Sequence, residues 1–384
     1  MMVEERDIAA FTFPFAAATA AAVYFSGIYA RAVTALASAS FIFAAAFLAI
    51  LVHIASSGIS FSRTGDIPGT GVRNPLFLII ATAIFCGLSC GFSGHLLSIS
   101  DCEGSLMSFA GRLGQRMQDA TDAMAFRNPR TNALVKALLT GNRSSLSPDT
   151  VHIFRSSGAS HILALSGLHL GIIYGIVKKL LSLAGGSRLS RIAGSVLSIM
   201  ICGFYTLSTG AGDSITRAFI FIALGESAAM FHRTRKLSRI LMAGLLVHLT
   251  LFPTAVTSIG FQLSYAAMAG IAWIYPPLRD IWTISPEDEK SGAGIMYKIW
   301  SMAALSIACQ ASAGVLAWFH FGTFPQYFLL TNLLAAPIAG LLIPAALLCL
   351  TCSTVFGSCP QIFLSITEFL SDSMTFILNV ISGI

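Results

Sequence analysis

The chain has 384 residues, of which 55% are hydrophobic and only 10% are charged, and its formal net charge is +6. Soluble domains carry roughly 25% charged residues, so this composition excludes a soluble enzyme, a disordered chain and a secreted disulfide scaffold. It predicts an integral membrane protein of the all-α class, because helices satisfy their own backbone hydrogen bonds inside a bilayer.

Long runs of residues that are poor in charge predict where the chain crosses the membrane. A spanning helix needs about 20 apolar residues, because each residue advances about 1.5 Å through a hydrocarbon layer about 30 Å thick. The runs in this sequence predict a polytopic helix bundle with about eleven transmembrane helices. In chain order they are residues 8–30, 32–62, 74–100, 156–177, 192–212, 214–231, 240–278 (two spans divided near Pro253), 299–359 (two or three spans) and 361–384.

Basic residues are concentrated in alternate loops between these runs. They gather after the fourth predicted span and again after the sixth, at Lys178, Lys179, Arg188, Arg191, Arg233, Arg235, Lys236 and Arg239. Because basic loops tend to stay in the cytoplasm, both loops are predicted to be cytoplasmic. The N-terminus is then cytoplasmic as well, and the segment before the fourth span lies on the outer face.

This outer segment, residues 93–160, is predicted to be helical rather than a free loop. Apolar residues recur three or four positions apart at Leu106, Phe109, Leu113, Met117, Ala120 and Met124, a spacing that predicts an amphipathic helix at the membrane interface or on the bundle. A second helix is expected over 131–139, ending at Gly141, and a third begins at Ser147-Pro148-Asp149 and ends at Gly158. The segment is either a cover packed on the spans or a lid that admits substrate. Three parts follow: three spans in 1–92, the outer segment 93–160, and a bundle in 161–384.

The fourth predicted span carries the densest group of polar residues at membrane depth. Gly167, Gly171 and Gly175 are spaced to form a ridge for helix packing. If the helix is unbroken, His161, Ser166 and His169 point away from that ridge. Since polar groups are costly in lipid, they either line an aqueous path or form hydrogen bonds in a packed bundle. No metal site is expected, because the two histidines are not spaced for joint ligation.

Other polar residues lie in the later spans. Asp213 and Arg217 are spaced for an ion pair on one helix; alternatively, Arg217 contacts an anion and Asp213 orients it. Glu226 is expected to pair with a base of the cytoplasmic cluster. The remaining candidates, which either line a path or join helices, are Gln262, Ser264 and Asn332, with Pro337 predicted to break its helix. Near the outer face, Cys90 and Cys102 are compatible with a disulfide or with two free thiols.

Several motifs in order resemble the core of the ComEC-type competence membrane domain. The first is Leu138-Leu139-Thr140-Gly141-Asn142-Arg143-Ser144, followed by Phe154-Arg155 and Gly158. The most distinctive runs from His161 through Ser166-Gly167-Leu168-His169 to Gly171. Weaker matches are Ser214-Ile215-Thr216-Arg217-Ala218, Phe261-Gln262-Leu263-Ser264-Tyr265 with Gly270, and Asn332-Leu333-Leu334-Ala335-Ala336-Pro337.

The resemblance implies a channel of the bacterial cytoplasmic (inner) membrane that moves single-stranded DNA into the cytoplasm during natural transformation. Implied partners are an outer-face DNA receptor and a cytoplasmic DNA-handling ATPase or single-strand-binding protein, and an oligomer is compatible with it. The H-x-H-x-D-H motif of the metallo-β-lactamase-like domain in longer members is not found in this sequence. The chain is therefore expected to be no enzyme, to need no cofactor, and to rely on a separate nuclease. The path-lining roles of His161, Ser166, His169, Arg217, Gln262, Ser264 and Asn332 are our own inference.

Two other functions compete with DNA import. A secondary transporter of a smaller anion would place Asp213 and Arg217 in its site, with Pro337 marking a broken helix. An intramembrane hydrolase would use His161, Ser166 and His169.

Overall fold

The computed structural model describes residues 5–28, 83–84, 86–88, 105–183, 188–231, 236–283, 292–322 and 326–383. Across these residues every regular element is helical and no strand is present, which confirms the all-α class. The second predicted span (32–62), most of the third (74–100) and the pair Cys90 and Cys102 lie outside the described residues.

Four helices in the described part of the chain are long and apolar enough to cross a membrane. They are Ser190–Ser208, Gly294–Phe321, Phe328–Phe356 and Gln361–Ser382, and two shorter apolar helices are Ala9–Tyr24 and Leu237–Leu251. They support a membrane protein, whereas the total of about eleven spans stays a prediction.

The chain divides into two compact units. Among the described residues, the first unit contains α1 (Glu5–Ile28), α11 (Leu237–Leu251), the short 3₁₀ turn η2 (Pro253–Thr257) and the first residues of α12 (Ile259–Ala269). Both α11 and η2 pack against α1. The predicted division of the 240–278 run is confirmed, because η2 begins at Pro253 and separates α11 from α12.

The second unit holds the other helices. In chain order they are α4 (Ser105–Asp122), α5 (Pro129–Thr140), α6 (Pro148–Ser156), α7 (Ser160–Leu163), α8 (Gly167–Ser182), α9 (Arg188–Ser208), α10 (Asp213–Met230), the rest of α12, the π-helical turn η3 (Gly270–Ile274), α13 (Tyr275–Arg279), α14 (Gly292–Cys309), the π-helical turn η5 (Gln310–Gly314), α15 (Val315–Phe321), α16 (Phe328–Phe356) and α17 (Gln361–Ser382).

Local cap chemistry explains the boundaries in the outer segment. Helix α5 ends at Gly141, whose φ of 78° is a left-handed conformation that glycine adopts without strain. Helix α6 begins as predicted, with Ser147 Oγ accepting the N–H of Thr150 at 3.2 Å and Pro148 in the first turn. Gly158, with φ 78°, then turns the chain toward α7.

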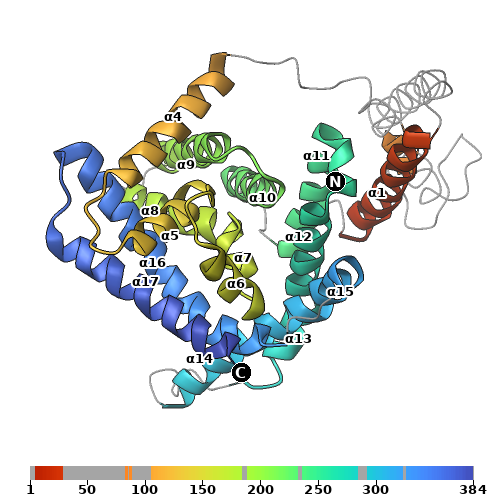
Figure 1. The fold of residues 1–384 in the computed structure, drawn as a ribbon. Helices are drawn as coiled ribbons and strands as arrows, with labels where there is room; N and C mark the ends of the chain where they lie inside the picture. The colour runs from red at the N-terminus through yellow and green to blue at the C-terminus, as the bar shows by residue number, and fades with distance from the viewer. Residues whose placement is uncertain are drawn as a thin grey trace, which may run out of the picture. The chain divides into compact units, whose positions relative to one another are not determined.

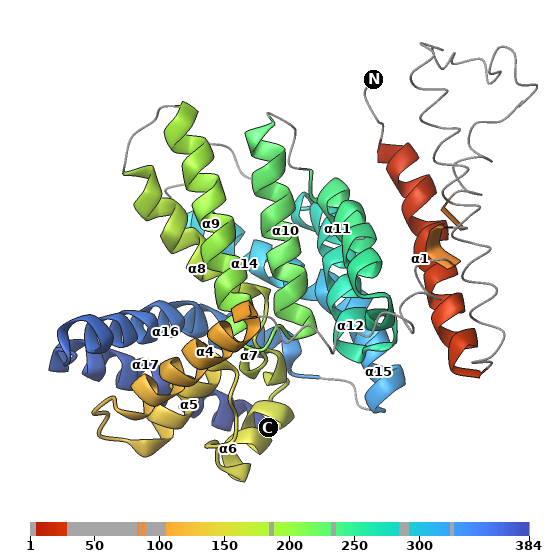
Figure 2. The ribbon, with the colours of Figure 1, turned by 90° about the horizontal axis from the view of Figure 1, so that it is seen from above.

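The helices of the outer segment pack on the last two helices of the chain. Figure 1 shows α16 and α17 side by side, with α5 beside them and α4 meeting them at one end, and Figure 2 shows the pair running across the direction of α8, α9 and α10. One buried cluster joins α5, α6, α7, α16 and α17 through residues that include Leu138, Phe154, Ile162, Leu342 and Met374. Because this burial is extensive, the segment is a packed part of the second unit.

Polar contacts also tie the outer segment to α17. The Glu368 carboxylate accepts the backbone N–H groups of Arg127 and Asn128, just before α5, and Asp372 Oδ1 accepts from Asn128 Nδ2 at 3.4 Å. Glu368 thereby satisfies backbone donors at the start of α5 that would otherwise lack partners, and Asp372 holds the Asn128 side chain.

Two predicted elements differ in the structure. The expected span 156–177 is not one helix: α7 ends at Leu163, Ala164 is extended, and α8 starts anew at Gly167. The helix containing Pro337 is not broken there, since α16 runs on from Phe328 to Phe356. Neighbouring helices packed around a membrane helix allow it to tolerate the hydrogen bond that proline removes.

Candidate functional site

Helix α8 begins with a reciprocal cap between Ser166 and His169. Ser166 is extended, with φ −118° and ψ 174°, and its Oγ accepts the N–H of Leu168 at 3.3 Å. In return, His169 Nδ1 accepts the backbone N–H of Ser166 at 3.2 Å. Glutamate or glutamine normally fills this third helical position, so histidine here takes over a capping role while placing a ring inside the protein.

The cap determines which ring nitrogen of His169 carries the proton. Because Nδ1 accepts a backbone N–H, the neutral ring has its hydrogen on Nε2. The His169 side chain is buried, with 1% exposed, and Nε2 has no hydrogen-bond partner among the described residues. A buried donor without an acceptor costs roughly 1–3 kcal/mol.

Arg217 of α10 is buried and held by neutral groups. Its Nη1 donates to the Ser264 carbonyl oxygen at 3.2 Å, and its Nη2 donates to the Ser214 carbonyl and Oγ at 3.4 and 3.3 Å. The guanidinium carbon lies 5.9 Å from the ring centre of Phe221. Only 7% of Arg217 is exposed, and its Nε has no partner within the described ranges.

The predicted ion pair between Asp213 and Arg217 is not formed. The hydrogen bonds of Arg217 go to Ser214 and Ser264, and no carboxylate among the described residues pairs with its guanidinium. The reason is that Arg217 turns toward α12, whose Ser264 carbonyl accepts it, while Asp213 lies in the first turn of α10.

The predicted glycine ridge makes a close approach only at Gly167. A Cβ built there would lie 3.5 Å from Arg217 Nη2 and 3.6 Å from the Cβ of Ala218 on α10. A Cβ on Gly171 or Gly175 would meet no other group within 4 Å in the described part of the chain. Packing of α8 is instead carried by larger apolar residues, such as Leu170, because they bury more surface.

Asn332 is a third candidate with a buried polar atom that lacks a partner. Its Nδ2 donates to Ser306 Oγ of α14 at 3.2 Å, while its Oδ1 has no hydrogen-bond partner among the described groups. Next to it, Thr331 Oγ1 donates to the Ser157 carbonyl at 2.5 Å and joins α16 to the end of α6.

The remaining candidates make other contacts, and the His161 ring lies within reach of the Asn332 side chain. His161 is exposed on the short α7, with its Nδ1 3.1 Å from the Gly158 carbonyl and its ring centre 5.3 Å from that of Phe328. No contact joins it to Ser166 or His169 among the contacts of the described residues. In the first unit, Gln262 Nε2 donates to the Val256 carbonyl at 2.9 Å and anchors η2 to α12.

A buried polar cluster lies near the other end of α8. The Glu226 carboxylate, 1% exposed, accepts from Lys178 Nζ and from the Tyr174 hydroxyl, and Lys178 also donates to Ser195 Oγ at 3.3 Å. The expected pairing of Glu226 with a base of the cytoplasmic cluster is therefore found, with Lys178 as that base. The part of Tyr174 was missed, because a tyrosine in an apolar run gives no sign of its partner.

Two π-helical turns face each other and were also not predicted. A Cβ on Gly270 of η3 would collide with Ser312 Oγ of η5 and with the Ala308 carbonyl, so the two turns are in close contact. Such turns are frequent at functional sites. Sequence offers no signal for them, because one extra residue in a helical turn changes no composition or cap.

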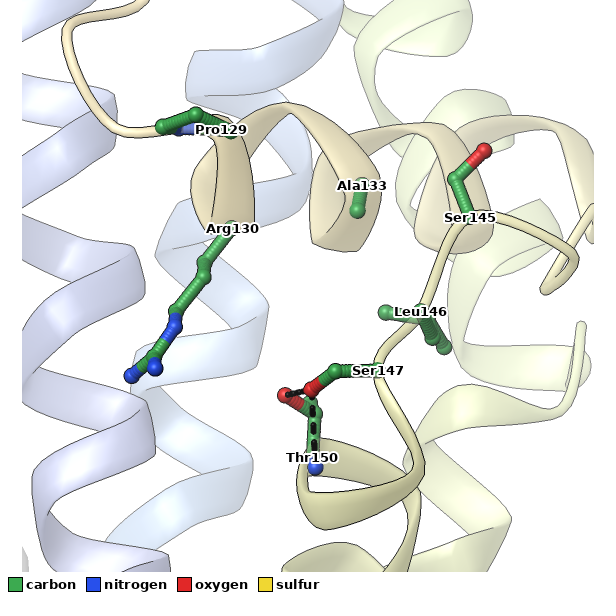
Figure 3. Close-up of a pocket in the computed structure, with 7 residues that line it drawn as sticks. All are labelled: Pro129, Arg130, Ala133, Ser145, Leu146, Ser147 and Thr150. Carbon is green, nitrogen blue, oxygen red and sulfur yellow. Dashed lines mark hydrogen bonds between the residues drawn. The ribbon is translucent and has the colours of Figure 1, made fainter.

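A shallow pocket of about 140 Å³ opens between the first turn of α5 and the loop before α6. Figure 3 shows the Arg130 side chain reaching past it, opposite the hydrogen-bonded pair Ser147 and Thr150. None of the residues predicted to line a path contributes to this pocket, which belongs to the outer segment.

Comparison with known proteins identifies the region that contains these side chains. Residues 138–384 match the family model described as competence protein. The chain is also similar to ComE operon protein 3 of Bacillus subtilis (strain 168), with 21% identity over 229 residues, which is 60% of this chain and 26% of that protein. The chain thus spans about a quarter of that relative, and no solved structure matches it. His169, Arg217 and Asn332 all lie within the matched region, and this chain belongs to the competence protein family.

Proposed function

We propose that this chain is a channel component that moves single-stranded DNA across the bacterial cytoplasmic membrane during natural transformation. Membership of the competence protein family and the apolar helices support a role in DNA uptake at a membrane. The passage of a single DNA strand through this chain is the step that we add to these two observations.

One observation carries the step from family to path. Three buried polar atoms, His169 Nε2, Arg217 Nε and Asn332 Oδ1, have no hydrogen-bond partner among the described residues, and they come from α8, α10 and α16. Native proteins leave few such atoms unsatisfied. Three of them, on residues that the sequence singles out as path lining, favour a region that water and a polar substrate enter.

The proposed topology puts the described outer segment where DNA would arrive. Residues 105–160 carry exposed arginines, at Arg112, Arg116, Arg127, Arg130, Arg143 and Arg155. Because nucleic-acid binding depends largely on phosphate neutralisation, this surface suits a strand handed over by an outer-face DNA receptor. In the cytoplasm, an ATPase or a single-strand-binding protein would draw the strand in, and a separate nuclease would degrade its complement.

The two competing functions receive less support from the geometry. For the import of a smaller anion, the buried Arg217 is present as expected. The ion pair with Asp213 and the helix break at Pro337, which this function also predicts, are both missing. Ser166 Oγ lies 3.2 Å from His169 Nδ1, as a hydrolase would need. However, Nδ1 also accepts the backbone N–H of Ser166 as part of the helix cap, and His169 Nε2 has no partner among the described residues that would orient the ring.

Deletion of the gene tests the proposed function when surface capture of DNA and import into the cytoplasm are scored separately. We expect capture to continue and import to stop, with import restored by a plasmid copy. Normal import in the deletion strain would reject the proposal. In proteoliposomes, transport of small anions without transport of DNA would favour the anion transporter instead.

A further inference from the structure

The first turn of α8 and the guanidinium of Arg217 lie against each other. Gly167, the first residue of α8, is so close that a Cβ on it would be 3.5 Å from Arg217 Nη2. Because glycine has no side chain, Gly167 leaves the guanidinium directly beside the helix terminus. Ser166 and Gly167 are half-exposed, so this end of the helix is open to approach.

Both groups at this junction favour a negative charge. The N-terminus of a helix carries partial positive charge and free backbone N–H groups, and α8 is 16 residues long. In this first turn, Ser166 Oγ accepts the backbone N–H groups of Leu168 and His169, so Gly167 is the residue of the turn whose N–H the cap does not use. The guanidinium adds a full positive charge, and its planar fork of donors matches the oxygens of a phosphate.

The positive charge of Arg217 is not neutralised by the described residues. Its hydrogen-bond acceptors are the neutral oxygens of Ser214 and Ser264, and its guanidinium carbon lies over the ring of Phe221. A buried charge without a counter-ion is costly. Nε lacks a partner among the described residues as well, and an anion bound beside Nη2, the guanidinium atom that lies against Gly167, would balance the charge.

We propose that Arg217 and the N-terminal turn of α8 form a binding site for a phosphodiester group of the DNA backbone. This inference rests on the proposed function and names the chemical group that the path recognises. The site holds one phosphate group and contacts no base, so it binds single-stranded DNA of any base sequence. Gly167 is required because its missing side chain leaves the anion room beside the guanidinium.

The chain offers a matched set of variants for this proposal. Arg217→Gln removes the positive charge. Gly167→Ala places a methyl group between α8 and the guanidinium, 3.5 Å from Arg217 Nη2, which is an ordinary contact distance that the fold tolerates. Gly171→Ala makes the same chemical change one turn later on α8, where no group of the described residues lies within 4 Å. It serves as the control.

The test measures binding of a fluorescent oligothymidylate to the full chain purified in detergent. We expect Arg217→Gln and Gly167→Ala to weaken binding by roughly tenfold to a hundredfold, the range for hydrogen bonds to charged groups, and Gly171→Ala to leave it unchanged. The salt dependence (log of the association constant against log of the salt concentration) should become shallower by roughly 0.7 in Arg217→Gln, as for one lost phosphate contact. An oligomer with uncharged methylphosphonate linkages should not distinguish the variants.

Equal binding by Gly167→Ala and the unchanged chain would overturn the site, even if Arg217→Gln proves unstable. Competition by inorganic phosphate at the concentrations that the oligomer needs would overturn the assignment to DNA and indicate a free anion. Because binding is measured without cells, a deletion strain that still imports DNA would reject the proposed function while leaving this result to be judged separately.

Discussion

His169 accepts a hydrogen bond from the backbone N–H of Ser166 and so closes the first turn of the helix that Ser166 begins. One side chain therefore has two separable tasks: Nδ1 stabilises the helix start, and the buried Nε2 is left for another partner. Variants that keep one task and remove the other can distinguish a path residue from a structural one.

Substitution of His169 separates these two tasks. Glutamine is a normal residue at the third position of a capped helix, so His169→Gln should keep the stability of the protein in detergent. His169→Leu should lower the stability by about 1 kcal/mol through loss of the cap. We expect both variants to lose DNA import, measured with labelled DNA in cells that contain equal amounts of protein. Full import by His169→Gln would assign the histidine to capping alone.

Ser166 can be tested as a cap and as a nucleophile with two substitutions. Asparagine caps helices about as well as serine does, whereas alanine costs roughly 0.5–2 kcal/mol. We therefore expect Ser166→Asn to retain stability and DNA import, and Ser166→Ala to lower the unfolding temperature. Loss of import in Ser166→Asn at normal stability would instead support a reaction that needs the hydroxyl.

The ion pair between Lys178 and Glu226 should stabilise the bundle mainly by avoiding an isolated charge. Lys178→Met leaves the Glu226 carboxylate buried without its cation. Breaking a buried ion pair lowers the free energy of unfolding by roughly 3–5 kcal/mol. We expect a value near the lower end, because the Lys178 side chain is 35% exposed. The double variant with Glu226→Met should recover much of that loss. Thermal unfolding in detergent measures both, and a double variant as unstable as Lys178→Met would show that the pair contributes more than charge balance.

Two glycines should respond to alanine in opposite directions. Gly141 has φ 78°, and a Cβ on it would lie 2.6 Å from Leu165 Cδ1, so Gly141→Ala should destabilise the protein by at least roughly 1–2 kcal/mol. Gly171→Ala should stabilise it by up to about 1 kcal/mol, because alanine is the better helix former. Unfolding temperatures decide, and destabilisation by Gly171→Ala would show that a close neighbour exists at this position after all.

Cysteine labelling in whole cells tests the predicted orientation. In a background with the native cysteines replaced by serine, Ser144→Cys in the outer segment should react with a membrane-impermeant maleimide. Ser182→Cys at the end of α8 should react only after the cells are opened. Both positions are exposed in the structure, so the reverse pattern would place the outer segment in the cytoplasm.

The membrane class, the family and several helix ends could be predicted from the amino-acid sequence alone. A low charge content acts over the whole chain, and the caps at Ser147, Gly141 and Gly158 act on backbone groups only a few residues away. Such signals need no knowledge of the rest of the fold. The motif around Ser166 also singled out residues that the structure later places at the start of α8.

The partner of each polar side chain, in contrast, depends on how the helices pack and could not be predicted. The spacing of Asp213 and Arg217 suits an ion pair, yet the guanidinium bonds to the Ser264 carbonyl, 47 residues away. The sequence does not reveal that these two groups meet in space, because their contact depends on how α8, α10 and α12 pack. The same packing leaves Arg217 without a counter-ion beside Gly167, since a buried group can bond only to what its neighbouring helices bring within reach.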